Sequence, residues 1–417
     1  MGYTLLRGSF VIRYPDLPRQ GPEPDGDTVK FLPDSPALVE ALPRRSGRPP
    51  NINARGISVR LEAIDALETH FAETHQELEG ANAARDELLR LLGFTNVRFW
   101  EDLPNKVRSA DQDSIRGHVL TNGIDGNGRL IAFGYAGDHP GADGTTVFVD
   151  GPLVDDSVNA RLLAAGLVYP AFYATLPAEL RTHLAEVSQA ARRKAIGIWP
   201  RSAADPNGSA TVRNLGELER LVVWPKLFRR IVPYLAAGFT DFDGFDAWLR
   251  ADPVNRDDEL FLIPRLERGN LHDVVRGSGQ QVRLTMWPED FIISPDPAPP
   301  GAPVTPPLVA AGDVVIVAAL PDPAGADRGN ETVTLMNLRP GTCDLSGWAL
   351  TDAGGGRKPL TGTIEGGAAL RVTLDSAVQL GNRGDTIILV DGEGATIDQV
   401  TYKVDQVKAG RTTCFGR

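Results

Sequence analysis

The sequence has very little cysteine, and this limits both disulfide and zinc chemistry. Only Cys343 and Cys414 occur among 417 residues, and no CxxC pair is present. Two cysteines cannot form a disulfide framework, and structural zinc sites use closely spaced thiolates. We therefore expect two reduced thiols, and a single bridge within the last hundred residues remains the open alternative.

The sequence also lacks long hydrophobic runs. No stretch of apolar residues is long enough to span a bilayer as a helix. The opening MGYTLLRGSFVIRYPDLPRQ has neither the apolar core nor the cleavage site of a secretory signal. These two absences favour a cytoplasmic protein without a transmembrane segment.

No part of the chain is basic. The formal net charge is −11, and acidic residues outnumber basic ones in each of the segments 1–200, 201–305 and 306–417. Tight, purely charge-driven binding to nucleic acid is therefore not expected. An enzyme that grips one or two phosphates locally remains compatible with this charge.

A proline-rich stretch divides the chain. PDPAPPGAPVTPP at Pro295–Pro307 is typical of an extended, semi-rigid linker. The length suggests two or three domains, and the mixture of helix-like and strand-like segments indicates an α+β protein. We predict a first domain at 1–200, a mostly helical connector at 201–294 that packs on it, the linker at 295–307, and a last domain at 308–417.

Periodicity predicts the elements of the first two parts. Strands are expected at Phe10–Tyr14, Thr28–Leu32, Ile57–Ile64 and Arg129–Tyr135. Helices are expected at Gly80–Leu92, Val158–Leu167, Leu176–Ile198, Asn214–Gly238 and Asp241–Ala251. The connector shows no chemical motif, and its apolar residues, such as Trp248, are interpreted as core.

Two aspartates precede the strand at Thr28–Leu32. Alternate residues of a strand share a face, so Asp25 and Asp27 are able to point the same way. A hard cation such as calcium relieves the repulsion between two such carboxylates. Taken alone, an ordinary Asp-Gly turn is the better explanation of this segment.

A third carboxylate follows at the end of the strand Ile57–Ile64. Val59 and Leu61 form one apolar face, Arg60 lies on the opposite face, and the next turn carries Asp65 and Glu68. Metal-assisted phosphodiester hydrolysis needs such parts, because a carboxylate orients water and guanidinium groups bind the developing phosphate charge.

A second arginine leaves a tight hairpin. Asp125-Gly126-Asn127-Gly128 is typical of a short turn, and Arg129 opens the strand that follows. A short turn would hold Arg129 rigidly. Taken alone, a surface arginine after a hairpin is the better explanation of this segment.

In order, DGDTVKF, VRLEAIDALET, DGNGRLIAFGY, VNARLLAAGLVYPAFY and QAARRKAIGIW resemble the staphylococcal nuclease (thermonuclease) family over about residues 8–199. The resemblance implies a five-stranded OB-fold barrel with packed helices. It assigns Asp27, Asp65 and the carbonyl of Ala66 as calcium ligands, with Asp25 in the outer shell. It assigns Glu68 as the general base, and Arg60 and Arg129 as the clamp on the scissile phosphate.

The sequence departs from this family at two places and keeps its aromatic residues. Leu67 stands where the family usually has proline, which predicts a looser turn before Glu68. Asn127 stands where a tyrosine is common, so one phosphate contact would be lost. Bases are expected to stack on Tyr169, Phe172 and Tyr173, with core packing as an equal alternative for Phe172.

The resemblance therefore predicts a calcium-dependent endo/exonuclease of DNA or RNA, for which magnesium or manganese is also possible. The alternative is a catalytically weak or inactive scaffold that only binds nucleic acid or protein. The intact carboxylates and arginines favour the enzyme. The net negative charge, Leu67 and Asn127 keep the alternative open.

The pattern of the last domain predicts a small β-sandwich. Short strands are expected at Val314–Leu320, Glu331–Asn337, Ala368–Leu374, Asp385–Asp391 and Thr396–Tyr402. With Asp344-Leu345-Ser346-Gly347-Trp348, this pattern resembles the lamin-tail domain, an immunoglobulin-like sandwich, and Trp348 is expected in its core. The resemblance implies a binding or targeting module for a protein, nucleic acid or envelope partner.

Overall fold

The computed structural model describes residues 2–44, 48–294, 312–339, 342–392 and 394–415, so the expected linker at 295–307 lies outside the described residues. The chain divides into two compact units. Unit 1 comprises residues 1–176, 180–260 and 269–307, and unit 2 comprises residues 177–179, 261–268 and 308–417. Most of the expected connector thus belongs to the same unit as the expected first domain.

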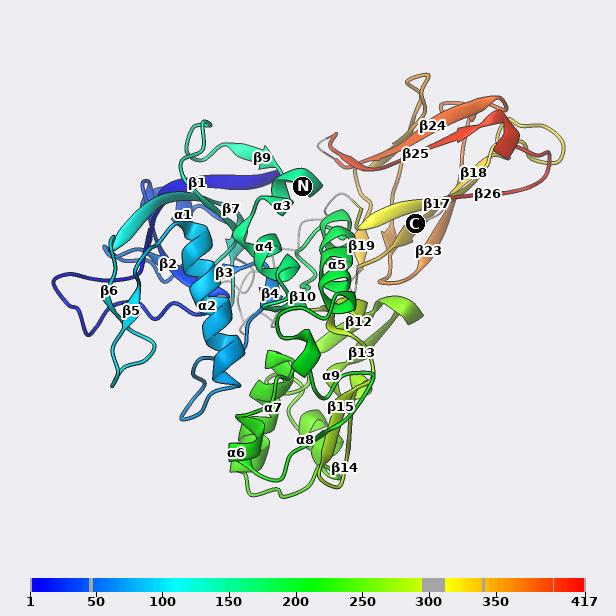
Figure 1. Cartoon of the computed structure of the whole chain (residues 1–417). Helices are drawn as coiled ribbons and strands as arrows, with labels where there is room; N and C mark the ends of the chain where they lie inside the picture. The colour runs from blue at the N-terminus through cyan, green and yellow to red at the C-terminus, as the bar shows by residue number, and fades with distance from the viewer. Residues whose placement is uncertain (1, 45–47, 295–311, 340–341, 393, 416–417) are drawn as a thin grey trace. The chain divides into compact units, whose positions relative to one another are not determined.

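Unit 1 is built around a closed five-stranded barrel (Figure 1). Its strands are β1 (Gly2–Val11), β2 (Thr28–Pro33), β3 (Ile57–Leu61), β7 (Ser114–Ile124) and β8 (Leu130–Ala136). They follow the order β2-β3-β8-β7-β1, the pairing of β1 with β2 closes the ring, and β9 (Thr146–Phe148) adds to β1. The pair β3–β8 is parallel, whereas the other barrel pairs are antiparallel. The expected barrel is therefore present.

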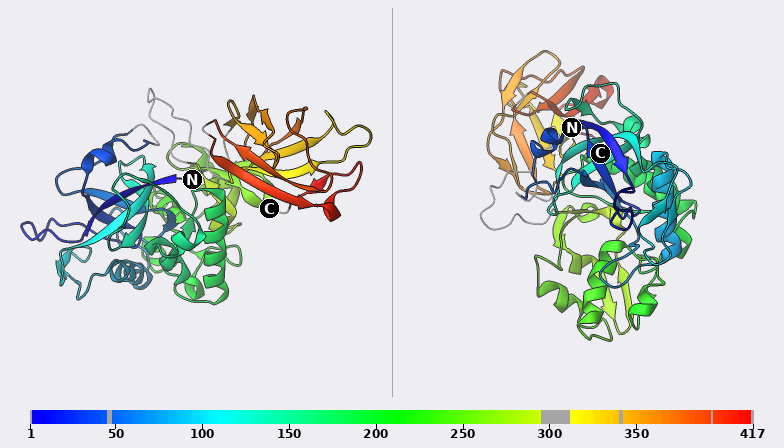
Figure 2. Two further views of the ribbon diagram at one scale, coloured as in Figure 1. Left: turned by 90° about the horizontal axis from the view of Figure 1, so that it is seen from above. Right: turned by 90° about the vertical axis from the view of Figure 1, so that its left-hand side faces the viewer.

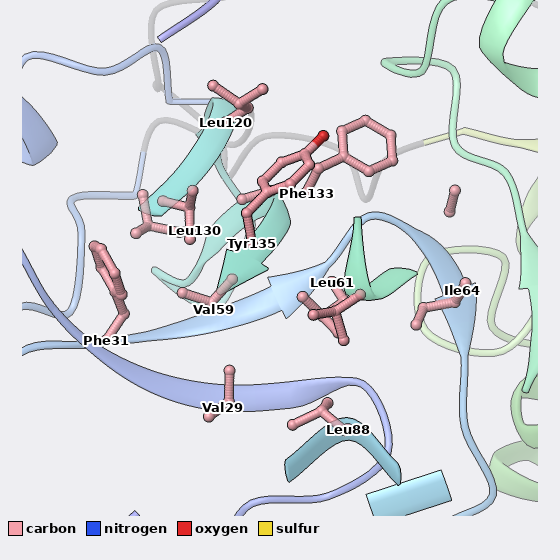
Figure 3. Packing of buried hydrophobic residues seen from close by; sticks show 14 of the residues in the cluster. Val29, Phe31, Val59, Leu61, Ile64, Leu88, Leu120, Leu130, Phe133 and Tyr135 are labelled. Carbon is pink, nitrogen blue, oxygen red and sulfur yellow. The ribbon is translucent and has the colours of Figure 1, made fainter. Parts of the chain in front are cut away.

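Alternation of apolar and polar residues explains how the barrel strands face. Val29 and Phe31 on β2, and Val59 and Leu61 on β3, are buried, while Arg60 between the last two points to the other face. Figure 3 shows these four buried side chains among residues of the hydrophobic core. The predicted faces of β3 are thus confirmed.

Short strand pairs and helices surround the barrel. The pairs are β4 (Ala63–Asp65) with β10 (Tyr169–Ala171), and β5 (Arg98–Phe99) with β6 (Val107–Ser109). The helices are α1 (Pro36–Glu40), α2 (Leu78–Leu92), α3 (Gly151–Asp155), α4 (Val158–Ala164) and α5 (Ala178–Arg193). Both α2 and α4 contact β8.

Most predicted elements are present, with shifted ends. The first strand is wrong by eight residues at its start, because β1 begins at Gly2 and ends at Val11. Helix α2 ends as predicted at Gly93, whose left-handed φ of 100° suits glycine. Helix α4 ends two residues before Gly166, and α5 ends at Arg193 and not at Ile198.

The segment 201–294 is not mostly helical, because short strands separate its helices. The helices are α6 (Leu215–Leu218), α7 (Pro225–Ala236), α8 (Phe245–Arg250) and α9 (Leu271–Val274). The strands are β11 (Ala210–Thr211), β12 (Glu259–Leu262), β13 (Glu267–Asn270), β14 (Val275–Ser278), β15 (Gln281–Leu284) and β16 (Phe291–Ile293). Pro225 explains why one predicted helix is two, since proline favours the first turn of a new helix.

Unit 2 holds a β-sandwich-like domain, whose strands Figure 2 shows in layers. One four-stranded sheet contains β17 (Val314–Leu320), β18 (Thr332–Asn337), β23 (Ala369–Thr373) and β26 (Thr413–Cys414). The other contains β20 (Ala349–Thr351), β21 (Arg357–Pro359), β24 (Gly384–Val390) and β25 (Thr396–Lys403). The small pair β19 (Cys343–Asp344) and β22 (Thr363–Ile364) completes it.

The core of the sandwich follows the sequence prediction closely. Trp348 is buried in a cluster with Leu335, Leu350 and Ile387, which confirms its expected place. Cys343 is buried and Cys414 is exposed, and both are free thiols. The alternative of a bridge between them is therefore wrong in this structure.

Candidate active site

The expected catalytic residues line one pocket of unit 1. This pocket, called the central pocket below, has a volume of about 390 Å³. Its acidic side chains are Asp25, Asp27, Glu62, Asp65, Glu68 and Asp125, and its basic side chains are Arg60, Arg129, Lys226, Arg229 and Arg230. Carboxylates and cations that are scattered over more than two hundred positions thus face one space.

The turn before β2 holds the first two aspartates. Asp25 accepts hydrogen bonds from the backbone N–H groups of Asp27 and Thr28, at 3.0 and 2.6 Å. The Oδ2 atom of Asp27 accepts from the N–H of Ala66 at 3.0 Å. A Cβ atom on Gly26 would lie 2.5 Å from the Cβ of Ala66, so only glycine permits this close approach.

Asp65 reaches the pocket through a kink after β3. Ala63 adopts a left-handed φ of 72°, which is unusual for a residue with a side chain. The buried amide of Asn159 on α4 donates to the carbonyls of Glu62 and Ala132, at 2.8 and 3.1 Å. This amide fixes the kink, and β4 then pairs with β10 and carries Asp65 to the pocket.

Gln76 holds Glu68 in place. The Glu68 N–H donates to Oε1 of Gln76 at 3.1 Å, and the Gln76 N–H donates to the carbonyl of Glu68 at 2.9 Å. Nε2 of Gln76 donates to the carbonyl of Val223 at 2.9 Å. Leu67 is buried. The turn before Glu68 was expected to be loose because Leu67 replaces proline. Hydrogen bonds with the buried Gln76 stabilise it instead.

The electrostatic environment of Glu68 suits a proton acceptor. Burial raises the pKa of Glu68 to about 7, against the lowering effect of Arg229, and the charges of Asp65 and Asp27 raise it further. Burial and then the charge of Asp27 raise the pKa of Asp25 as well. A general base near neutral pH needs a pKa in this range.

Arg60 lies over an aromatic ring in the pocket. Its guanidinium carbon is 4.5 Å from the ring centroid of Tyr173, which is a cation–π distance. Burial acts to raise the pKa of Tyr173, but the charges of Arg60 and Lys226 outweigh it, so the pKa is lowered. Tyr173 is the only one of the three expected stacking residues that lines the pocket.

Tyr169 and Phe172 lie elsewhere. Tyr169 is 2% exposed, and its hydroxyl lies 2.9 Å from Oγ of Ser202. Phe172 is fully buried in the core of unit 1. Because neither ring has an accessible face, the structure does not present them for stacking on a base, and the core alternative holds for Phe172.

Arg129 is anchored by the hairpin before it. Its backbone N–H donates to Oδ1 of Asp125 and its Nε donates to Oδ2, both at 2.8 Å. The same carboxylate accepts from the N–H of Asn127, also at 2.8 Å. This turn holds the guanidinium of Arg129 at the edge of the pocket, as the hairpin pattern predicted.

Helix α7 supplies cations that the sequence reasoning missed. Arg229 donates to both oxygens of Asp65, at 3.1 and 2.9 Å, and also to Glu68. Lys226 and Arg230 pair with Asp258, at 2.5 and 2.8 Å. The available signal was the spacing of these three basic residues, because positions three and four apart share one face of a helix.

Asp27 and Asp65 could hold a divalent cation by the nature of their donors. Carboxylate oxygens are the ligands that calcium and magnesium prefer. Among the residues that the structure describes, no three His, Cys, Asp or Glu side chains form a group that could hold a metal ion. Both oxygens of Asp65 accept hydrogen bonds from Arg229. The expected role of the Ala66 carbonyl as a calcium ligand stays a prediction.

Comparison with known proteins identifies the C-terminal part. Residues 308–404 match the Lamin Tail Domain family. The lamin tail domain thus accounts for the sandwich of unit 2, as its strand pattern predicted. No curated protein matches the chain. The nuclease resemblance of residues 8–199 stays a prediction. In the described part of the chain, no helix is long and apolar enough to cross a membrane.

Proposed function

We propose that unit 1 is a divalent-cation-dependent phosphodiesterase that hydrolyses DNA or RNA. The observation that carries this proposal is the central pocket, where Asp27, Asp65 and Glu68 face Arg60 and Arg129. These side chains come from three separate segments of the sequence. Phosphodiester hydrolysis needs this combination, because a carboxylate must activate water while cations hold the phosphate.

Each side chain has a role in the proposed reaction. Glu68 accepts the proton of the attacking water, which its raised pKa favours. Arg60 and Arg129 bind the phosphoryl oxygens as their negative charge grows. Asp27 and Asp65 would hold the cation, which is calcium by resemblance, with magnesium or manganese as alternatives. When bound, that cation polarises the phosphoryl oxygens.

Tyr173 gives the pocket a further feature that suits a nucleic acid. Arg60 covers one aromatic face, and the hydroxyl-bearing ring lines the same space as the phosphate-binding groups. An aromatic ring beside an arginine is suited to a base that follows a phosphate. Because the chain is acidic overall, this recognition depends on local contacts and not on the net charge.

A cleavage assay tests the proposal. The full chain is incubated with plasmid and with denatured DNA, in calcium, magnesium or manganese and in chelator. Glu68→Gln is expected to lower kcat by about 10²–10⁴-fold. Glu87→Gln is the matched control, because Glu87 pairs with Arg90 on the surface of α2. Absence of cleavage in all three metals would contradict the proposal.

One observation favours the second candidate, a scaffold that binds nucleic acid without cutting it. Arg229 occupies the two carboxylates, Asp65 and Glu68, that hydrolysis requires. A gel-shift with single-stranded DNA in calcium, without cleavage, would support this alternative.

We infer that the lamin tail domain is a binding or targeting module for a protein, nucleic acid or envelope partner. The match to the lamin tail family supports this, and the central pocket lies in unit 1. Deleting residues 306–417 should leave cleavage unchanged and alter the cellular location. Loss of cleavage on deletion would instead give the domain a part in catalysis.

A further inference from the structure

Among the residues that the structure describes, Arg229 is the side chain that pairs with both Asp65 and Glu68. Its Nη2 atom lies 2.9 Å from Oδ2 and 3.1 Å from Oδ1 of Asp65, and its Nη1 atom donates to Glu68. The side chain of Arg229 is 22% exposed, and that of Asp65 is 4% exposed. Water therefore screens this ion pair little.

The contact is built into the fold. Helix α7 begins at Pro225, after the cap residue Trp224, and its apolar residues Leu227, Phe228 and Ile231 are fully buried. These neighbours fix the helix, so the backbone of Arg229 has little freedom to move away from the pocket. The side chain alone is able to change its position.

Carboxylates gather around Arg229 in the central pocket. Asp25, Asp27, Asp65 and Glu68 are four carboxylates in one space. The Asp25 carboxylate accepts hydrogen bonds from the backbone N–H groups of Asp27 and Thr28. Arg229 supplies one positive charge to the pair Asp65 and Glu68, and its planar fork suits two carboxylates.

A divalent cation on Asp65 and the guanidinium of Arg229 would use the same oxygen atoms. Both oxygens of Asp65 already accept hydrogen bonds from Arg229. A metal ligand must offer a free lone pair in the direction of the ion, and two positive groups at one carboxylate repel each other. The two partners of Asp65 therefore compete.

We propose that Arg229 is a positioning residue, a tethered counter-cation that occupies Asp65 and Glu68 until a divalent cation displaces it from Asp65. This inference rests on the proposed cation-dependent function. It adds that residues of the connector, outside the segment that resembles a nuclease, set the cation affinity of the site. Displaced from Asp65, the guanidinium remains beside Glu68 and within reach of the pocket that holds the phosphodiester.

Calcium binding by the full chain tests this proposal independently of cleavage. Chelator-treated wild type, Arg229→Met and Arg229→Lys are titrated with calcium by isothermal titration calorimetry. Arg229→Met should bind calcium at least about tenfold more tightly than wild type, since the competing charge is gone. Arg229→Lys should lie between the two, because its single ammonium cannot bridge both carboxylates.

Arg230→Met is the matched control. Arg230 lies on the same helix and lines the same pocket, but it pairs with Asp258. It removes the same charge without freeing Asp65, so its calcium affinity should stay close to that of wild type. An equal gain in Arg230→Met would show a general charge effect and overturn the specific role of Arg229.

Thermal unfolding gives a second readout that a purely structural ion pair would not produce. In chelator, Arg229→Met should melt below wild type, because Asp65 and Glu68 lose their counter-charge. Calcium should then raise its Tm by more than it raises that of wild type. If Arg229→Met does not fold, Arg229→Lys carries the same comparison.

The outcomes separate the two proposals. If wild type cleaves DNA with calcium but Arg229→Met binds calcium no more tightly, the proposed function stands and this inference is wrong. If both proteins bind calcium as expected but neither cleaves DNA, the inference stands and the proposed function is wrong. If no variant binds calcium, magnesium or manganese, the inference is wrong.

Discussion

Arg229 and Asp65 are 164 positions apart in the sequence, and their side chains share two hydrogen bonds at 3.1 and 2.9 Å. The first residue belongs to helix α7 and the second to the end of β4. The central pocket is therefore not complete within residues 1–200. Removal of the connector would leave buried carboxylates unpaired, which is costly.

Asp27→Ala should abolish activation by the metal. Asp27 is one of the two expected carboxylate ligands, and its loss should lower cleavage by at least about 100-fold. The measurement is initial cleavage rate against calcium concentration. Asp16→Asn serves as the control, because Asp16 pairs with Arg55 on the surface. Equal activation of Asp27→Ala and wild type would contradict the assignment.

Glu68 should make the stability of the cation-free protein depend on pH. Its pKa in the folded chain is about 7, above the ordinary value of 4.5, so folding favours the protonated form. Its contribution to stability is then highest below pH 4.5, falls as pH rises to about 7, and is constant above.

The difference between wild type and Glu68→Gln isolates this effect. Tm is measured in chelator from about pH 5 to about pH 8. The Tm of wild type should fall relative to that of Glu68→Gln as the pH rises through this window. Parallel curves would show that the pKa of Glu68 is close to its ordinary value. Glu87→Gln should follow wild type.

Asn159→Ala should destabilise unit 1 and disturb the site. Its buried amide binds the carbonyls of Glu62 and Ala132 and accepts from the N–H of Gly134 at 3.0 Å. Unpaired, these groups should lower the free energy of unfolding by roughly 1–3 kcal/mol. Denaturant unfolding measures the loss. Asn255 is exposed, so Asn255→Ala should leave stability unchanged. A similarly small effect for both variants would refute the role of Asn159 in holding the kink.

Trp348→Ala should destabilise the lamin tail domain alone. The side chain is 6% exposed in the core of the sandwich, so a cavity is expected to cost about 3–5 kcal/mol. Calorimetry should show an earlier transition for this domain while DNA cleavage is unchanged. A matching loss of cleavage would mean that the stability of the pocket depends on the domain.

Local sequence patterns predicted much of the fold. Alternation located β3 and its buried Val59 and Leu61, and Gly93 located the end of α2. The strand β17 was predicted to the residue, at Val314–Leu320. In each of these cases neighbouring residues alone fix the pattern, because the periods of strand and helix are short.

The full set of residues around the central pocket was less predictable than the fold. Asp25, Asp27, Arg60, Asp65, Glu68 and Arg129 were found through resemblance, and the structure places all six around the central pocket. Arg229 was missed because its partners lie in a different part of the sequence. Basic residues on an amphipathic helix are typical of solvated surfaces, so tertiary packing had to reveal it.

The kink after β3 was not predictable for a related reason. A strand was expected through Ile64, but Ala63 takes a left-handed φ and the chain turns there. Asn159 stabilises this turn through the carbonyl of Glu62, 97 positions away. Nothing in the local composition distinguishes an alanine that must adopt this conformation from one in an ordinary strand.

The turn at Gly26 limits the size of the side chain at position 84 of helix α2. A Cβ on Gly26 would come within 2.7 Å of the Cβ of Ala84, which is buried on the face of α2 that meets the turn. A residue larger than alanine at 84 would push the same turn outward. Exchange of Ala84 for valine would therefore alter the spacing of Asp25 and Asp27, so a helix with no charge in the pocket governs the geometry of its carboxylates.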